Sequence, residues 1–343
     1  MRTSNLATCV ALKTSQLNDD TDALASSLLA FGGVGTTFLR VLKDRFASLE
    51  GRVTIDVVAI GDSSGFVWIP TPSGSFQGIE WGVLDRVLTA KHSQPVCRLA
   101  SFDGIDKLAV TSLDRLLDAV VPNGAFDLAL VDCTSSPLMA AQLIKAKRLG
   151  IAVVLANKLP ISLRSNDYLQ LVADDALVRS QRVRYEATVG AGIPVLAVLQ
   201  RLVASRDSIH SVQGSLSGTM NYMLTAMLGG ATFSEALHAA RSRGITEADP
   251  REDLSGADVA RKMIILAREL RPLEPTLPEI ADVEIVPMLP PEMLVLSCDE
   301  FLVRASECDD GQCAMADSLG HSPVQSPPPL PDHSVVSTHE DRA

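Results

Sequence analysis

The feature that most constrains the fold is a glycine-rich turn between an apolar run and an amphipathic helix. The run ends in LLAFGGVG, and the next residues, TTFLRVLKDRF, have apolar side chains at helical spacing. The later runs VTIDVVAI, FDLALVDC and IAVVLANK are apolar enough for buried strands, and a helical segment that stops at a glycine separates the last two. Strands that alternate with helices predict an α/β fold with a Rossmann-type, doubly wound parallel sheet.

The glycine-rich turn is typical of a dinucleotide-binding site. Gly32 and Gly35 match the second and third glycines of the dinucleotide fingerprint, whereas Ala30 stands at the first position. The helix that follows would present free N–H groups to a phosphate. A tight strand-to-helix turn without a ligand has a similar pattern. The residues predicted to contact a cofactor here are Gly32, Gly33, Val34 and Gly35.

Polar residues follow several expected strands at the edge where ligands bind in open α/β sheets. Asp62, after the second strand, would bind a ribose hydroxyl or serve as the turn aspartate of GDSSG. Thr134, Ser135 and Ser136 follow the strand LVDC and would contact a ligand or cap a helix. Lys158 ends VVLANK, where it would contact a bound dinucleotide, orient a substrate or donate a proton; the alternative is a surface lysine.

The segment GITEADPREDLSGADVARK, residues 244–262, is the densest in acids. Asp258 and Lys262 are four residues apart and therefore share one face of a helix. Ser255 and Asp258 match the S-x-x-D capping box, so one interpretation is a capped helix with an exposed ion pair. The other is an acid–lysine pair tuned for proton transfer. The acids upstream, which suit a substrate ammonium group, favour the second interpretation.

Composition excludes several classes of function. The net charge is −11, and nucleic-acid binding needs a surface rich in Lys and Arg, so we expect no nucleic-acid partner. No apolar run reaches the ~18 residues of a membrane helix, so we expect no membrane partner. Six scattered cysteines without a C-x-x-C pair predict reduced thiols, with neither disulfides nor zinc. A cytoplasmic location is expected, and the Ser/Thr-rich N-terminus keeps a plastid location open.

The pattern changes along the chain and predicts four parts. Beyond about residue 158, a Gly-rich bend, several helices and one expected strand in SIHSVQGSLSG indicate an α+β substrate domain. The last residues are rich in Pro and Ser and cannot bury a core, which predicts disorder. The expected parts are a poorly ordered N-terminus, a dinucleotide-binding domain, a substrate domain and a disordered tail, at residues 1–23, 24–158, 159–305 and 306–343.

These segments together resemble homoserine dehydrogenase, in its stand-alone plant and algal type. The matching strings are LLAFGGVG, VDCTSS, VVLANK, YEATVGAGIP, GSLSGTMNYML and GITEADPREDLSGADVARK, in the family's order and spacing. The resemblance implies an oxidoreductase that interconverts L-homoserine and L-aspartate 4-semialdehyde in the biosynthesis of threonine, methionine and isoleucine. It also implies NADP or NAD as the cofactor, and a homodimer formed through the substrate domain.

The resemblance implies roles for individual residues. Lys262 and Lys158 would assist proton transfer and bind substrate, and Glu247 and Asp258 would hold the ammonium and hydroxyl region of homoserine. Thr219 would line the substrate site. The bend EATVGAGIP would hold a sodium-type cation, although residues alone leave open that its carbonyls only make a turn. The main-chain oxygens implied as cation ligands are those of Glu186, Val189, Ala191 and Ile193.

The sequence also departs from the family pattern. Ala30 replaces a glycine, Ile245 stands where a tyrosine is usual, and Leu159 stands where a second lysine is common. The family's closing segment, with its second glycine-rich turn, is not found after about residue 305. An alternative is therefore a catalytically impaired relative that binds nucleotide or partners. A third hypothesis, supported by Ile245, is an oxidoreductase for another small amino-acid aldehyde.

Overall fold

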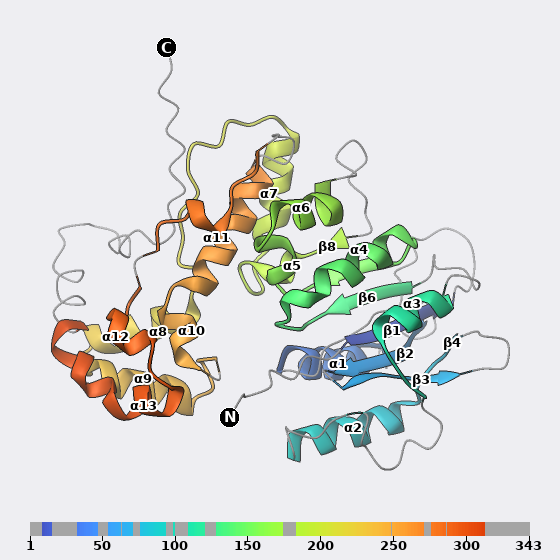
Figure 1. Ribbon diagram of the computed structural model, residues 1–343, viewed down its shortest axis with the longest axis horizontal. Coiled ribbons are helices and arrows are strands. Elements are labelled where there is room, and N and C mark those ends of the chain that lie inside the picture. Colours follow the sequence, from blue (N-terminus) through green and yellow to red (C-terminus); the bar gives the residue numbers. More distant parts are fainter. Residues whose placement is uncertain are drawn as a thin grey trace. The chain divides into compact units, whose positions relative to one another are not determined.

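The chain, shown as a computed structural model in Figure 1, forms two compact units that divide after Pro194. The sequence predicted the domain boundary after residue 158. The apolar run ALASSLLAF, expected as the first strand, lies outside the described residues. The structure describes residues 9–15, 33–46, 54–62, 64–70, 76–93, 99, 109–120, 128–173, 183–247, 249–270, 276–285 and 287–312.

The first unit is built on an eight-stranded sheet. Its order is β4-β3-β2-β1-β6-β7-β8, and β5 pairs with β3. Strands β6, β7 and β8 are parallel, as expected for strands joined by helices, which confirms the α/β class. The strands are β1 (Cys9–Ser15), β2 (Thr54–Asp62), β3 (Gly65–Pro70), β4 (Phe76–Gln77), β5 (Ala109–Thr111), β6 (Leu128–Asp132), β7 (Ala152–Leu155) and β8 (Val183–Arg184).

The central strand was not predicted, because residues 9–15 fall in the N-terminus expected to be poorly ordered, and its direction differs from that of the predicted parallel sheet. β1 lies between β2 and β6, the place of the first strand in a doubly wound sheet, but it runs antiparallel to both. The pairs β2–β3, β3–β4 and β3–β5 are antiparallel as well. Hydrophobic patterning indicates where strands lie and not which way they run. The sheet is therefore mixed, with a parallel half from β6 to β8.

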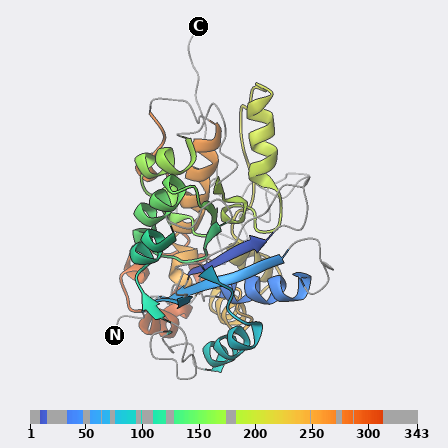
Figure 2. The ribbon, with the colours of Figure 1, turned by 90° about the vertical axis from the view of Figure 1, so that its right-hand side faces the viewer.

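Helices cover both faces of this sheet. Figure 2 shows α1 and α2 on one face and α3 and α4 on the other. Apolar residues of α1 and α2, such as Leu39 and Leu84, pack with Val57 and Ile60 of β2 in one buried cluster. The helical segments are α1 (Gly33–Phe46), α2 (Trp81–Ser93), α3 (Leu113–Val120), η4 (Pro137–Met139), α4 (Ala140–Arg148), α5 (Leu159–Ser162), α6 (Ser165–Tyr168), η5 (Leu169–Ala173) and η6 (Glu186–Thr188).

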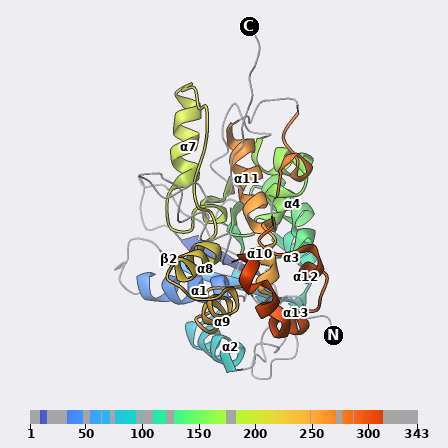
Figure 3. The same ribbon diagram turned by 90° about the vertical axis from the view of Figure 1, so that its left-hand side faces the viewer.

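Helices are the only regular secondary structure among the described residues of the second unit (Figure 3). Residues 207–217, which contain the expected strand, form neither helix nor strand. A strand needs a hydrogen-bonding partner, and no described segment of this unit supplies one. The helical segments are α7 (Val195–Ala204), α8 (Gly218–Leu228), α9 (Phe233–Ser242), α10 (Pro250–Leu254), α11 (Ala257–Leu270), η7 (Ile280–Asp282), α12 (Pro291–Leu294), α13 (Cys298–Arg304) and η8 (Ala305–Cys308).

Two charged residues at the end of α11 are fully buried and paired. Arg268 donates to the carbonyl oxygen of Pro278 over 3.0 Å and to the carboxylate of Glu279 over 2.9 Å. Glu269 accepts a hydrogen bond of 2.9 Å from Gln200 of α7. Buried charges are tolerated only with such partners. These bonds fix the end of α11 against α7 and η7.

Order in the second unit continues beyond the predicted start of the tail at residue 306. Asp309 accepts hydrogen bonds from the N–H and hydroxyl of Ser234, over 2.7 and 2.9 Å. The start of α9 also carries a capping box between Thr232 and Glu235. Residues 306–312 therefore pack on the start of α9.

Among the described residues, none of the helices combines the length and the apolar character that crossing a membrane requires.

Candidate functional site

The carboxyl ends of β6 and β7 form the first candidate region. The two strands are parallel, and Asp132 is in register with Leu155, so the segments that follow them leave the sheet at one edge. The N–H groups of Ala156 and Asn157 donate to the carbonyl oxygen of Asp132 over 2.8 and 3.1 Å. This is the edge where open α/β sheets bind ligands. It carries the predicted residues Thr134, Ser135, Ser136 and Lys158.

Asn157 connects the two segments through its buried side chain. Its Nδ2 donates to Asp132 Oδ2 over 3.0 Å and to Thr134 Oγ1 over 2.9 Å. The same nitrogen lies 3.0 Å from the carbonyl oxygen of Ser136. Its Oδ1 accepts from the N–H of Leu159 over 3.1 Å. One amide therefore holds the segment after β6 and the turn after β7 in a fixed relation.

The small hydroxyl residues after β6 serve mainly to shape this edge. The N–H of Thr134 donates to Asp132 Oδ1 over 2.8 Å, and the Thr134 hydroxyl accepts from the N–H of Ser136 over 3.1 Å. The Ser136 hydroxyl caps η4 by accepting from the N–H of Leu138 over 3.2 Å. The capping interpretation therefore holds for Ser136. Ser135 is exposed and is available to a ligand at this edge.

Burial controls the titration of the groups at the end of β6. Burial raises the pKa of the Asp132 carboxyl, while hydrogen bonds from Thr134 and Asn157 act in the opposite direction. Burial and the nearby Asp132 raise the pKa of the Cys133 thiol to about 12. That thiol stays protonated at neutral pH and is a poor nucleophile. A ligand at this edge would therefore make its polar contacts with hydroxyl groups, main-chain N–H groups and Lys158.

Asp62 occupies the turn role that the sequence left open. Its carboxylate accepts hydrogen bonds from the N–H and the hydroxyl of Ser64, the N–H over 2.8 Å. Its other oxygen accepts from the N–H of Leu99 over 2.9 Å. The side chain is buried, with 6% exposed. These contacts tie the end of β2 to residue 99.

The start of α1 suits a phosphate group. The helix begins at Gly33 and has no acidic residue in its first turn. Gly35 is buried, whereas Val34 is 59% exposed. Free N–H groups and the helix dipole attract anions to such a start. Gly33, Val34 and Gly35 therefore fit a dinucleotide phosphate, and Gly32 lies outside the described residues.

Lys158 stands at the N-cap position of α5 and is half-buried. It follows Asn157 directly, so the anchored turn after β7 determines where its main chain lies. Sequence reasoning identified this lysine and missed the asparagine. In the sequence, only the position of Asn157 in the string A-N-K pointed to it. The spacing of residues along the chain does not reveal which amide side chain will be buried.

The second candidate region is the acid–lysine pair on α11. Lys262 Nζ lies 2.7 Å from Asp258 Oδ2, and the two side chains are 16% and 24% exposed. The same nitrogen donates to the carbonyl oxygen of Leu216 over 2.5 Å. The pair is therefore largely enclosed, unlike the exposed ion pair of the alternative interpretation. Burial of a lysine beside a carboxylate is an arrangement that suits proton transfer.

The expected capping box for α11 is replaced by another arrangement. The helix begins at Ala257, one residue after Gly256, whose φ of 77° lies in the left-handed region. Ser255 ends α10, and its hydroxyl accepts from the N–H of Ala257 over 3.3 Å. Ser255 is thus one residue too early to be the N-cap partner of Asp258. The positive φ explains the glycine, since other residues are strained there.

Asp253 organises the loop that carries Glu247. The Asp253 carboxylate accepts from the N–H of Glu247 over 2.9 Å and is 9% exposed. Burial raises its pKa, and hydrogen bonds from the Glu247 N–H and the Thr219 hydroxyl act in the opposite direction. The single hydrogen of this hydroxyl is shared with a second acceptor, the carbonyl oxygen of Ile245, which lies 3.1 Å from Thr219 Oγ1. Asp253 was not among the predicted site residues, and only the number of acids in this segment pointed to it.

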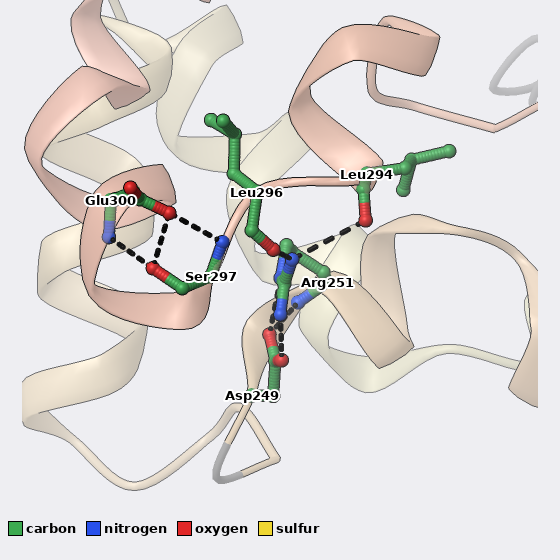
Figure 4. A network of polar contacts seen from close by, with 6 residues as sticks. All are labelled: Asp249, Arg251, Leu294, Leu296, Ser297 and Glu300. Atoms are coloured by element: carbon green, nitrogen blue, oxygen red, sulfur yellow. Dashed lines mark hydrogen bonds and ion pairs between the residues drawn. The ribbon is translucent and has the colours of Figure 1, made fainter. Parts of the chain in front are cut away.

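Asp249 and Arg251 fasten the acid-rich segment to α12 and α13 (Figure 4). The guanidinium group of Arg251 pairs with both carboxylate oxygens of Asp249 and donates to the carbonyl oxygens of Leu294 and Leu296. This guanidinium lowers the pKa of the Asp249 carboxyl. Bidentate pairs of this kind are strong and geometrically specific. They hold the start of α10, and with it the segment that contains Glu247.

The bend at residues 186–193 has an unusual main chain. Gly190 and Ala191 have φ values of 87° and 52°, and a left-handed alanine costs about 1 to 2 kcal/mol. The N–H of Ile193 donates to the carbonyl oxygen of Gly190 over 2.9 Å, and that of Val189 to Glu186 over 3.4 Å. No cluster of metal-ligating side chains occurs in the described part of the chain. A cation here would depend on main-chain oxygens.

Comparison with known sequences points to one family. Residues 194–321 match the family model described as homoserine dehydrogenase. The chloroplastic bifunctional aspartokinase/homoserine dehydrogenase 2 of Zea mays is 32% identical over 293 residues, which cover 84% of this chain and 29% of that protein. The bifunctional enzyme of Haemophilus influenzae is 36% identical over 201 residues, 58% of this chain and 24% of that protein. The chain thus spans less than a third of these relatives.

Solved structures agree with this assignment. A hyperthermophilic archaeal homoserine dehydrogenase, in complex with NADPH, has a TM-score of 0.55 and 27% identity, covering 74% of this chain and 72% of that chain. A Candida auris protein of unknown function has a TM-score of 0.64 and 26% identity, covering 84% of this chain and 74% of that one. Residues 194–321 therefore correspond to a homoserine dehydrogenase domain, and most of the chain is similar in sequence and fold to homoserine dehydrogenases.

Proposed function

We propose that this chain catalyses the NAD(P)-dependent interconversion of L-homoserine and L-aspartate 4-semialdehyde, a step in the biosynthesis of threonine, methionine and isoleucine. The observation that carries the proposal is the enclosed Asp258–Lys262 pair, which lies within the segment that matches the homoserine dehydrogenase model. An acid and a lysine 2.7 Å apart are groups that can serve to move the hydroxyl proton during alcohol oxidation.

Each candidate site residue of the second unit has a defined role in the proposed reaction. The carboxylates of Glu247 and Asp258 hold the ammonium and hydroxyl region of homoserine. Lys262 accepts the hydroxyl proton directly or through a water that it positions. For Lys158, an assisting role in proton transfer is proposed, as the resemblance implies. Thr219 lines the substrate site and keeps the Ile245 carbonyl in place. A bound nicotinamide nucleotide supplies the hydride acceptor.

For the cofactor, we propose NADP or NAD, bound at the carboxyl edge of the first unit. The archaeal relative with NADPH supports this choice. The exposed, acid-free start of α1 would bind the phosphates through its main-chain N–H groups. Ser135 and Lys158 would contact the nucleotide, while Thr134, Ser136 and Asp62 shape the segments around it. The residues proposed at the start of α1 are Gly32, Gly33, Val34 and Gly35.

A monovalent cation is also proposed at the bend, held by main-chain oxygens of Glu186, Val189, Ala191 and Ile193. The left-handed conformation of Ala191 supports it, because strained main chain is usually retained where it has a role.

A homodimer through the second unit is proposed as well. Val198 and Leu202, one turn apart on α7, are 50% and 38% exposed, and exposed apolar residues on one helix face favour association. The chloroplastic names of plant relatives support a plastid location as the alternative to the cytoplasm.

The test combines a turnover assay with a binding assay. The purified chain should reduce NADP⁺ or NAD⁺ when L-homoserine is added, and a thermal-shift titration should show binding of the same nucleotide. Binding without turnover would favour the catalytically impaired relative. Turnover with another small amino-acid alcohol in place of homoserine would favour a different substrate, for which Ile245 is the structural candidate.

A further inference from the structure

The amide of Asn157 is placed where two functional segments meet. The side chain is 3% exposed. Its two amide hydrogens face three acceptors within 3.0 Å, on Asp132, Thr134 and Ser136. All three acceptors belong to β6 or to the segment that follows it. A single side chain from the turn after β7 therefore fixes the neighbouring segment.

The side-chain oxygen of Asn157 contacts the residues that follow it in the chain. It accepts from the N–H of Leu159 over 3.1 Å, and Leu159 is the residue after Lys158. The N–H of Asn157 itself donates to the carbonyl oxygen of Asp132 over 3.1 Å. Lys158 thus lies between two anchored residues. Its main chain cannot shift without disturbing the contacts of the segment after β6.

We infer that Asn157 is a positioning residue: it sets the distance between Lys158 and the nucleotide-contacting segment, residues 134–136. The inference rests on the proposed function for the identity of the ligand, a nicotinamide dinucleotide. An amide that only filled the core would not need partners in both of these segments. The side chain touches neither reacting group, so its effect is exerted through Lys158 and through the main chain at Ser135.

The decisive variant is Asn157→Asp, which keeps the size of the side chain and the acceptor for Leu159. It removes both amide donors and places a second carboxylate beside Asp132. Asn157→Ala is the neutral second variant, should the added charge prevent folding. Gln170→Ala is the matched control, because this amide accepts from Arg148 over 2.8 Å at the end of α4. That end precedes β7 and is therefore opposite the carboxyl edge.

Two readouts separate positioning from general stability. The KM for the nucleotide should rise about tenfold or more in the Asn157 variants, the loss expected when one or two hydrogen bonds are removed. The KM for homoserine, which depends on Glu247 and Asp258, should stay within about twofold of the wild-type value. Nucleotide affinity, measured by fluorescence titration, should fall in parallel. Gln170→Ala should match the wild type in every measurement.

A second experiment does not depend on activity. Hydrogen exchange in the peptide that covers residues 133–139 should accelerate about tenfold in Asn157→Asp, and the rate at which an amine reagent labels Lys158 should change by about twofold or more. Unchanged exchange and labelling in the folded variants would overturn the inference. A wild-type chain that neither binds nor reduces a nucleotide would instead overturn the proposed function, and the exchange data would still decide the role of Asn157.

Discussion

At the scale of single residues, the surroundings of Cys133 show how burial determines chemistry. The thiol follows β6 directly, beside the buried carboxyl of Asp132. Burial and that carboxyl raise its pKa to about 12. Because the thiolate is the reactive form, we expect Cys133 to resist iodoacetamide at pH 8 in the native protein and to react after denaturation in urea. Mass spectrometry of the labelled peptides checks this; rapid labelling of the native protein would contradict it.

Some functional residues could be predicted from spacing and others could not. Asp258 and Lys262 are four residues apart in a helical pattern, and the structure brings them to 2.7 Å. The contact of Asp62 with Ser64 fits the turn interpretation, but its contact with Leu99 could not be predicted, because residue 99 is distant in the sequence. Asn157 was missed for the same reason. Spacing reveals local pairs, whereas burial and long-range partners depend on the whole fold.

At the scale of elements, the junction of α10 with α12 and α13 depends on an ion pair. The guanidinium of Arg251 lowers the pKa of Asp249 in the folded state. The pair therefore stabilises the protein fully above the ordinary carboxyl pKa of about 3.9, and the stabilisation is lost as the pH falls through the lowered value. We expect Asp249→Asn to lower the free energy of unfolding by about 1 kcal/mol at pH 7, since the pair is partly screened by solvent.

The difference in the free energy of unfolding between Asp249→Asn and the wild type should shrink below pH 4, as the Asp249 carboxylate takes up a proton and becomes neutral like asparagine. Urea denaturation at several pH values measures it. Glu307→Gln is the matched control: its exposed pair with Arg304 also lowers the carboxyl pKa, but solvent screens it almost completely. No measurable change in the free energy of unfolding is expected for Glu307→Gln. A difference for Asp249→Asn that stays constant from pH 7 to pH 3 would show that the pair does not act through its charge.

The secondary structure was predictable where its pattern was local. The apolar spacing of α11 and the short apolar runs of β6 and β7 identified these elements, and their parallel pairing followed from the helix between them. β1 was not predicted, since residues 9–15 fall in the expected poorly ordered N-terminus, and an apolar pattern would not have revealed its antiparallel direction. Residues 207–217, where a strand was expected, form neither helix nor strand. Strand formation depends on a pairing partner, which the sequence does not identify.

At the scale of the whole molecule, the proposed homodimer gives a separate test. The exposed apolar residues on α7 belong to the second unit, which the family model matches. We expect the wild-type chain to sediment at twice its own mass. Val198→Glu should shift it to the monomer, because a charge would be buried in the interface. Val303→Glu, at a residue of α13 that is 82% exposed, is the control. A wild-type monomer, or an unaffected dimer in Val198→Glu, would contradict this interface.

The central claim is that the chain oxidises homoserine through Lys262. The most direct measurement is the homoserine-dependent reduction of NADP⁺ or NAD⁺ by the wild type, by Lys262→Ala and by Lys145→Ala. Lys145 is the matched control, since it forms a surface ion pair of 2.7 Å with Asp118. We expect turnover by the wild type and by Lys145→Ala, and a fall in kcat of about 100-fold or more for Lys262→Ala. Absence of turnover by the wild type with either nucleotide, or equal rates in the two lysine variants, would contradict it.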